Sequence, residues 1–308
     1  MSIIAAIVRM RNRLRSTREP DWQRAGRLGE NLVADAMGPR FITVSERFVP
    51  YRDGRTQEIK HRECDVLIVG QYAVYAAEVK AVKGTIIPNQ QGRWGYIPPG
   101  QHQEVRQYHD LARHQRWFAG AIRDVIEAHG QHAYVYPLVV FTNRHADISR
   151  VYDCGHVIYL DEMRPIIERN ERQQAMTPEK RPINQRAVSE ILLGLDTWDF
   201  IETDRGVFKG WIEPREVSVI HGDGRQATLA TSDLLDVRMQ QGSAFDRRDT
   251  ALFRLRDGRV FRASLNPSEE FRIGVHDDFF SHRASNITRM TFGRRQPTRI
   301  DELQRAML

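Results

Sequence analysis

The sequence predicts an α/β domain with a mixed sheet flanked by helices, followed by a small β-rich domain. The first half alternates apolar runs of strand length with segments of helical periodicity, whereas the second half contains many short strand-like runs. Between the two halves lies the polar stretch "RQQAMTPEKRPINQR", which carries two prolines and no apolar periodicity. We therefore expect a linker at residues 173–185 that joins a domain at residues 21–172 to a domain at residues 186–308.

The elements of the first domain follow from apolar spacing and from residues that end helices. The first helix opens with Pro20 and Asp21 and stops at Gly38-Pro39, and "AYVYPLVVFT" is typical of a strand buried on both faces. The expected helices lie at residues 20–38, 101–130 and 161–174. The expected strands and hairpins lie at residues 40–49, 63–69, 72–80, 84–98, 133–142 and 156–160.

The second domain is expected to begin with a helix at residues 185–195 and to continue as short strands. Its strongest local signal is Asp257-Gly258 between two alternating segments, which predicts a hairpin. No internal repeat is evident from the sequence.

The composition favours a globular protein with an anionic partner. Of the 308 residues, 41% are hydrophobic and 28% are charged, which argues against wholesale disorder. The net charge of +6 favours a polyanion such as nucleic acid as partner. Cys64 and Cys154 are too few for a disulfide framework and form no zinc motif, so we expect a reducing, cytoplasmic setting.

The N-terminal segment, residues 1–20, is basic. Its apolar run of about six residues is too short to span a bilayer. The arginines follow this run, which is the reverse of the order in a secretory signal. We expect a basic helix here and no membrane association, with an amphipathic helix on a membrane or on a partner as the alternative.

The stretch "ECDVLIVGQYAVYAAEVK", residues 63–80, predicts two buried strands with charges at their ends. A two-residue turn at Gly70-Gln71 places Asp65, Glu78 and Lys80 on one face, because side chains alternate along a strand. A four-residue turn has the same effect, whereas a three-residue turn separates them. Carboxylates about 7–8 Å apart on the diagonal can converge on one cation and otherwise repel each other. The alternative is that these charges form ordinary salt bridges at strand ends.

Lysine is rare in this chain, since only 5 of the 46 basic residues are lysine. A lysine at the end of the hairpin therefore carries more weight than an arginine would. Lys83, Arg93 and Trp94 follow in a loop that could hold phosphate and stack a base. A tryptophan folded beneath the hairpin is the alternative for Trp94.

Four segments in order resemble one known family. "ECDVLIVG" and "YAAEVKAVKG" resemble the core motifs of the nuclease-related domain, NERD, which belongs to the PD-(D/E)xK or restriction-endonuclease-like superfamily. "GRLGENLVADAM" resembles its first helix, and "QHQEVRQYHDLARH", followed by "PLVVFTN", resembles its glutamine-bearing helix and next strand. The resemblance covers residues 21–172 and implies a restriction-endonuclease-like sheet.

The resemblance also implies a role for each matching residue. Asp65 and Glu78 resemble the metal-binding acids, and Lys80 resembles the residue that orients or polarises the attacking water. Glu30 resembles the helix acid near the metal, although an edge glutamate that reaches solvent is an equal alternative. Gln103 resembles the helix polar group that faces the site.

One departure leaves the glutamine open, because many family members carry Asn-Pro two residues before it and this chain reads "PPGQHQ". Gln107 is therefore a second candidate beside Gln103.

The function that these residues predict is a metal-dependent nuclease, a phosphodiester hydrolase that uses Mg²⁺ or Mn²⁺ and prefers DNA to RNA. Oxygen ligands suit these hard cations, which neutralise charge and activate water. The alternative is a catalytically silent module with a nuclease-like fold that binds nucleic acid or a protein. Resemblance also suggests work within a DNA-processing or defence assembly, with a partner such as a helicase docked on residues 186–308.

Overall fold

The computed structural model describes residues 21–88, 93–103, 106–153, 156–213, 216–220, 224–240, 250–265, 270–275 and 278–293. The basic segment expected at residues 1–20 lies outside the described residues, as does Cys154. The described chain forms two compact units, residues 25–196 and residues 21–24 with 197–293. This division lies later in the chain than the linker expected at residues 173–185.

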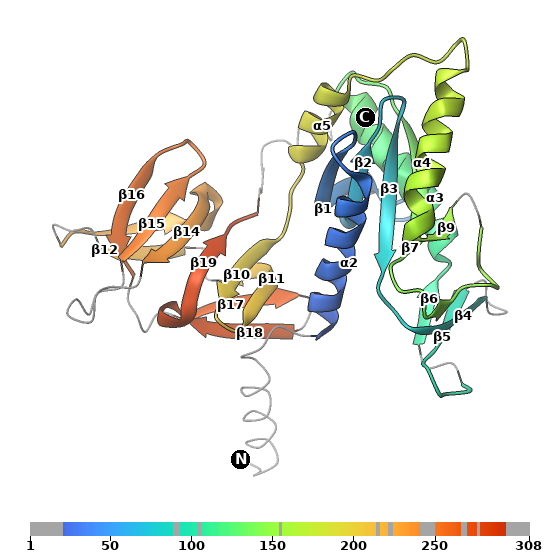
Figure 1. Ribbon diagram of the computed structural model, residues 1–308. Helices are drawn as coiled ribbons and strands as arrows, with labels where there is room; N and C mark the ends of the chain where they lie inside the picture. Colours follow the sequence, from blue (N-terminus) through green and yellow to red (C-terminus); the bar gives the residue numbers. More distant parts are fainter. Residues whose placement is uncertain are drawn as a thin grey trace. The chain divides into compact units, whose positions relative to one another are not determined.

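The N-terminal unit is built on a five-stranded mixed sheet (Figure 1). Its first three strands are antiparallel and its last two are parallel to β3. In spatial order the strands are β1 (Ile42–Arg52), β2 (Ile59–Val69), β3 (Ala73–Lys80), β7 (Tyr134–Phe141) and β9 (Val157–Tyr159). The helices are α2 (Asp21–Met37), α3 (Leu111–Ala128), α4 (Leu160–Ala175) and α5 (Gln185–Leu193). The expected mixed sheet flanked by helices is confirmed.

The helices cover both faces of this sheet, so β2 and β3 contribute apolar side chains to two cores. Leu67 and Val69 pack with α3 and α5, whereas Val66 and Ile68 pack with α2 and α4. All four side chains are fully buried, and each contributes about 1.5–3 kcal/mol of burial free energy. Helix α5, expected to open the second domain, packs instead on the first through Val188 and Leu192.

A second, four-stranded sheet contains β6 (Arg106–His109), β5 (Arg93–Ile97), β4 (Gly84–Pro88) and β8 (Ala146–Asp147). The helix expected over residues 101–130 is therefore wrong in its first third. Residues 106–109 pair with β5, which satisfies their backbone groups in a ladder. Asp110 then caps α3, because its side chain accepts a hydrogen bond of 2.9 Å from the backbone N–H of Arg113.

A buried carboxylate on α4 fixes the turn between β2 and β3. One oxygen of Glu171 accepts hydrogen bonds from the backbone N–H groups of Gln71, at 2.7 Å, and Tyr72, at 3.0 Å. Its other oxygen accepts from the hydroxyl of Tyr75 at 3.0 Å. A Cβ atom at Gly70 would lie 2.5 Å from Glu171 Oε1, so a larger residue here would displace the carboxylate from its hydrogen bonds.

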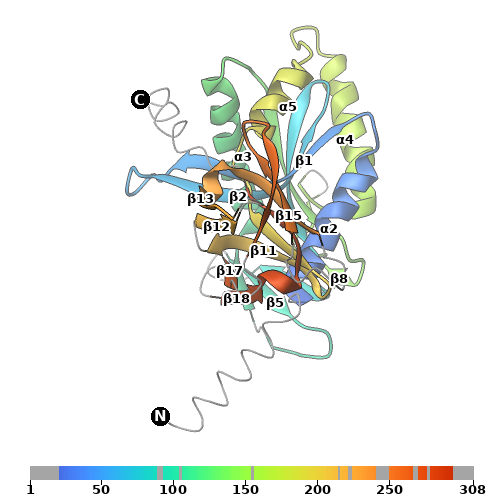
Figure 2. The same cartoon turned by 90° about the vertical axis from the view of Figure 1, so that its left-hand side faces the viewer.

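The C-terminal unit is a ten-stranded antiparallel sheet, which confirms the expected β-rich domain (Figure 2). The spatial order is β13-β12-β16-β15-β14-β19-β10-β11-β17-β18. The strands are β10 (Asp199–Thr203), β11 (Gly206–Glu213), β12 (Glu216–Ile220), β13 (Gln226–Ala230), β14 (Leu234–Gln240), β15 (Thr250–Leu255), β16 (Val260–Ser264), β17 (Glu270–Val275), β18 (Asp278–Arg283) and β19 (Ile287–Thr291). Two 3-10 turns, η1 (Thr231–Asp233) and η2 (Ala284–Asn286), precede β14 and β19.

This order reveals a repeat of secondary-structure elements that is not evident from the sequence. Residues 199–240 and 250–291 each contain four strands, a 3-10 turn and a fifth strand. The final strands of the two copies pair with each other around Val237 and Met290. The sequences "DRGVFKGWIE" and "DGRVFRASL" occupy equivalent places in the two copies, but they share too few residues to reveal the repeat unaided.

The two copies exchange their first hairpins. β10 and β11, from the first copy, pair with β19 and β17 of the second. β15 and β16, from the second copy, pair with β14 and β12 of the first. Each half of the sheet therefore contains strands from both copies.

Candidate functional site

The charged ends of β2 and β3 meet at one place in the N-terminal unit. The strand register pairs Val66 with Ala77 and Val69 with Val74, and its continuation by one residue sets Asp65 opposite Glu78. Both side chains therefore project to the same face of the hairpin. The turn consists of Gln71 and Tyr72, one residue later than expected, because the backbone N–H of Gly70 donates to the carbonyl oxygen of Ala73 at 2.8 Å and Glu171 holds the backbone of Gln71 and Tyr72. The two carboxylates are consequently direct neighbours rather than diagonal ones.

Glu78 lies between two cations. Lys80 Nζ is 2.5 Å from Glu78 Oε1, and Arg62 Nη2 is 3.3 Å from Glu78 Oε2. All three side chains are largely buried: the exposed fraction is 12% for Glu78, 22% for Lys80 and 24% for Arg62. Asp65 Oδ2 accepts a hydrogen bond of 2.7 Å from the backbone N–H of Val79, which ties β2 to the end of β3.

The environment shifts the pKa values of the two acids in opposite directions. Burial raises the pKa of Asp65 to about 7, and the charge of Glu78 acts in the same direction against the opposing effect of Lys80. Burial acts to raise the pKa of Glu78 too, but Lys80 and Arg62 outweigh it and hold that pKa below its ordinary value. Burial acts to lower the pKa of Lys80, but Glu78 and Asp65 raise it overall. Glu78 and Lys80 are therefore charged at neutral pH, while Asp65 is divided between two forms.

Helix α2 packs closely on the end of β3. A Cβ atom at Gly29 would lie 3.2 Å from Val79 Cγ1 and 3.4 Å from Thr142 Oγ1, so glycine permits this close approach. Glu30, the next residue, is 8% exposed and therefore does not extend into solvent. Its role as the helix acid stays a prediction.

The glutamine candidates lie in different places from those expected. Gln103 is an exposed residue in a bend, and Gln107 is an exposed residue on β6 whose Oε1 accepts from Arg93 Nη1 at 3.5 Å. Neither is on a helix, because α3 begins only at Leu111.

Gln115 is a third glutamine, which the sequence reading did not identify. It is 2% exposed on α3, and its Nε2 donates to the carbonyl oxygen of Ala76 on β3 at 2.9 Å. Its Oε1 is buried without a hydrogen-bond partner among the described residues. The sequence does contain an indication of this buried residue. Gln115 follows Leu111 by four residues and precedes Phe118 by three, which places an amide within the apolar stripe of the helix.

The basic and aromatic loop also separates into buried and exposed parts. Trp94 is 5% exposed and packs with Ile86 and Phe141 beneath the small sheet, which agrees with the alternative of a tryptophan folded beneath a hairpin and not with base stacking. Arg93, on the same strand, is exposed, and so is Lys83. The alternation of side chains along β5 turns Trp94 inward and Arg93 outward.

The side chains near the two acids offer few ligands for a divalent metal. Among the described residues, no group of three or more histidine, cysteine or acidic side chains is placed to hold a metal ion. Two adjacent carboxylates nevertheless suit Mg²⁺, which takes one or two carboxylates and completes its shell with water and substrate phosphate. Burial and, after it, the charge of Glu78 raise the pKa of Asp65, and a bound cation would oppose both effects.

Residues 25–142 match the sequence model of the nuclease-related domain family. Over these residues the chain is similar to NERD domains. The match runs from α2 to the end of β7 and includes both acids, Lys80 and Glu30. No curated protein sequence matches the chain. None of the described helices is long and apolar enough to cross a membrane.

Proposed function

We propose that the NERD-like domain is a metal-dependent nuclease that hydrolyses phosphodiester bonds, with DNA preferred over RNA. The observation that carries the proposal is the meeting of Asp65, Glu78 and Lys80 at the end of the β2–β3 hairpin. This hairpin is central to the segment that matches the nuclease-related family. The charge of +6 supports a polyanionic substrate.

Asp65 and Glu78 would hold the cation through their carboxylate oxygens. A bound Mg²⁺ or Mn²⁺ would supply charge neutralisation at the scissile phosphate and a more acidic water. Glu30 and Gln115 are proposed to orient groups around the acids from α2 and α3, since each is buried on a helix that packs against β3.

Lys80 is proposed to act as a compact positive charge in the reaction. Its ammonium group now pairs with Glu78, and a small rotation of its long side chain would turn it to a phosphate oxygen or to water. A positive charge at that point stabilises the negative charge that develops during hydrolysis. Arg62 still pairs with Glu78 when Lys80 turns, so the carboxylate would keep one cationic neighbour.

A silent binding module is the second candidate function, and one observation favours it. Glu78 is already neutralised by two side chains of the protein, so its need for a metal is reduced. In that case the domain would bind nucleic acid or a protein without cutting.

Cleavage assays separate the two candidates. The purified full chain is incubated with supercoiled plasmid, linear DNA and RNA in the presence of Mg²⁺, Mn²⁺ or EDTA. We expect cleavage of DNA with either metal, none with EDTA and none for Asp65→Ala. Binding without cleavage of any substrate in either metal would establish the binding module instead.

A further inference from the structure

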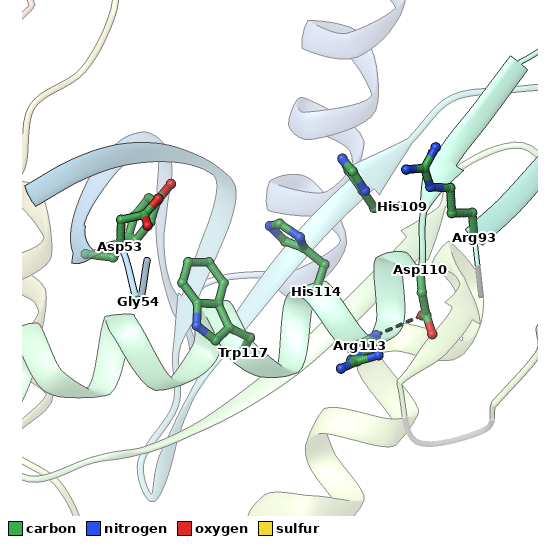
Figure 3. Close-up of a pocket in the computed structure, with 9 residues that line it drawn as sticks. Asp53, Gly54, Arg93, His109, Asp110, Arg113, His114 and Trp117 are labelled. Atoms are coloured by element: carbon green, nitrogen blue, oxygen red, sulfur yellow. Dashed lines mark hydrogen bonds between the residues drawn. The ribbon is translucent and has the colours of Figure 1, made fainter. Parts of the chain in front are cut away.

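A pocket of about 590 Å³ opens on the N-terminal unit beside the first half of α3 (Figure 3). It contains aromatic and basic side chains from three places in the chain. Its lining residues are Tyr51, Asp53, Gly54, Arg93, His109, Asp110, Arg113, His114 and Trp117. Neither Asp65 nor Glu78 lines it, so it is separate from the acids.

Four rings form a continuous row along the pocket. The ring centres of Tyr51 and Trp117 are 4.8 Å apart, and those of Trp117 and His114 are 5.5 Å apart. His109 continues the row at 6.0 Å from His114. Figure 3 shows the rings of Trp117 and His114 rising from α3 on the same side. Trp117 remains 46% exposed, so a large apolar surface is available at the centre of the row.

The charges around these rings favour an anion. Asp53 is engaged by Lys60 at 2.6 Å and by the backbone N–H groups of the turn after it, and Asp110 caps α3. Arg113, in contrast, is exposed and forms no ion pair within the described part of the chain. Arg93 reaches the same pocket from β5. Two arginines therefore line the pocket, while both of its carboxylates are engaged within the fold.

A short series of contacts links the pocket to the proposed catalytic acids. Trp117 lies beside Phe118, with ring centres 6.4 Å apart. The guanidinium group of Arg62 lies 5.1 Å from the centre of the Phe118 ring, and the same group pairs with Glu78. These contacts connect the pocket, through the buried side chain of Phe118, to the pair formed by Arg62 and Glu78.

We propose that this pocket binds an unpaired nucleotide of the substrate strand, with the base against Trp117 and the phosphate between Arg93 and Arg113. Every base presents a flat face to an aromatic side chain, whereas a paired base keeps that face within the duplex. The proposal rests on the proposed nuclease function and adds that the substrate is single-stranded, frayed or branched where it meets α3.

The test measures binding apart from cleavage. A fluorescein-labelled oligothymidylate of about 12 nucleotides, within the length range of known single-strand sites, is titrated with the full chain in EDTA, and a duplex of equal length is titrated in parallel. We expect Trp117→Ala to weaken binding of the single strand about tenfold or more, because stacking contributes on this scale for each base. Trp117→Phe, which keeps a ring, should retain most of the affinity.

Arg113→Ala tests the phosphate side of the same pocket. We expect weaker binding. The slope of log K against log salt concentration should also become shallower by about 0.7, the contribution of one phosphate contact to a single strand. Arg116→Ala is the matched control, because Arg116 is exposed on the same helix and does not line the pocket. It should bind the single strand nearly as tightly as the wild type does and with nearly the same salt dependence.

The outcomes are distinct from those of the cleavage assay. If Trp117→Ala and Arg113→Ala both bind the single strand as the wild type does, the pocket assignment is wrong even if the protein cuts DNA. If Trp117→Ala weakens the duplex as much as the single strand, the unpaired nucleotide is excluded. If the single strand binds as expected but no metal supports cleavage, the nucleotide pocket stands and the nuclease proposal fails.

Discussion

Replacement of Glu171 by alanine should destabilise the N-terminal unit by about 4 kcal/mol. The carboxylate accepts three hydrogen bonds, from the backbone of Gln71 and Tyr72 and from the hydroxyl of Tyr75. A hydrogen bond to a charged acceptor contributes about 1.5–3 kcal/mol, and the change leaves three donors to find new partners near the turn. Water can bond to some of the freed donors at the turn. The expected loss of stability therefore lies near the lower end of the sum of the three hydrogen bonds.

Two controls separate this effect from a general effect of altering α4. Glu168 on the same helix pairs with Arg164 near solvent, so Glu168→Ala should cost about 0.5 kcal/mol or less. Tyr75→Phe should cost about 1–2 kcal/mol in the wild type and much less in Glu171→Ala, because the two side chains share one hydrogen bond.

The measurements are denaturant unfolding and amide hydrogen exchange of Gln71 and Tyr72, whose protection should fall sharply in Glu171→Ala. Unchanged exchange at both amides, together with a loss below about 1 kcal/mol, would refute the assignment of Glu171 as the residue that fixes the turn.

Three further predictions concern the metal, the reaction and pH. Mn²⁺ should raise the melting temperature of the wild type with increasing concentration but not that of Asp65→Ala, and equal shifts in both would exclude this carboxylate as a ligand. Lys80→Ala should lower the cleavage rate about a hundredfold to a thousandfold while leaving DNA affinity nearly intact, and Lys80→Arg should fail similarly; cleavage and filter binding on the same preparations measure both effects. Burial lowers the pKa of His282 from 6.5 to about 4, so the neutral form stabilises the folded C-terminal unit above pH 6.5 and this contribution is lost as the pH falls toward 4. The loss should reach about 3 kcal/mol in denaturant unfolding, and a pH slope that persists in His282→Phe would exclude His282 as its origin.

The sequence predicts the central hairpin well because its strands are apolar on both faces. Such strands belong to the middle of a sheet, and alternation then assigns Asp65 and Glu78 to one face for any turn of even length. The exact register could not be predicted, since Glu171 lies about a hundred residues away in the sequence and its contact with the turn is purely tertiary.

The predicted start of α3 was wrong, and the sequence could not decide between the two alternatives for Trp94, for a related reason. The apolar spacing before Leu111 is compatible with a helix, and only pairing with β5 makes residues 106–109 a strand. That same small sheet turns Trp94 inward. Gln115, by contrast, was open to prediction, because an amide inside the apolar stripe of a helix needs a partner in the core.

The exchanged hairpins of the C-terminal unit have a consequence for synthesis on the ribosome. β10 and β11 emerge well before β17 and β19, with which they finally pair. A nascent chain that ends before residue 250 can pair these strands only within the first copy. To reach the observed sheet, such early pairings must be avoided or must break, so this unit completes its fold only after its last strand has been made.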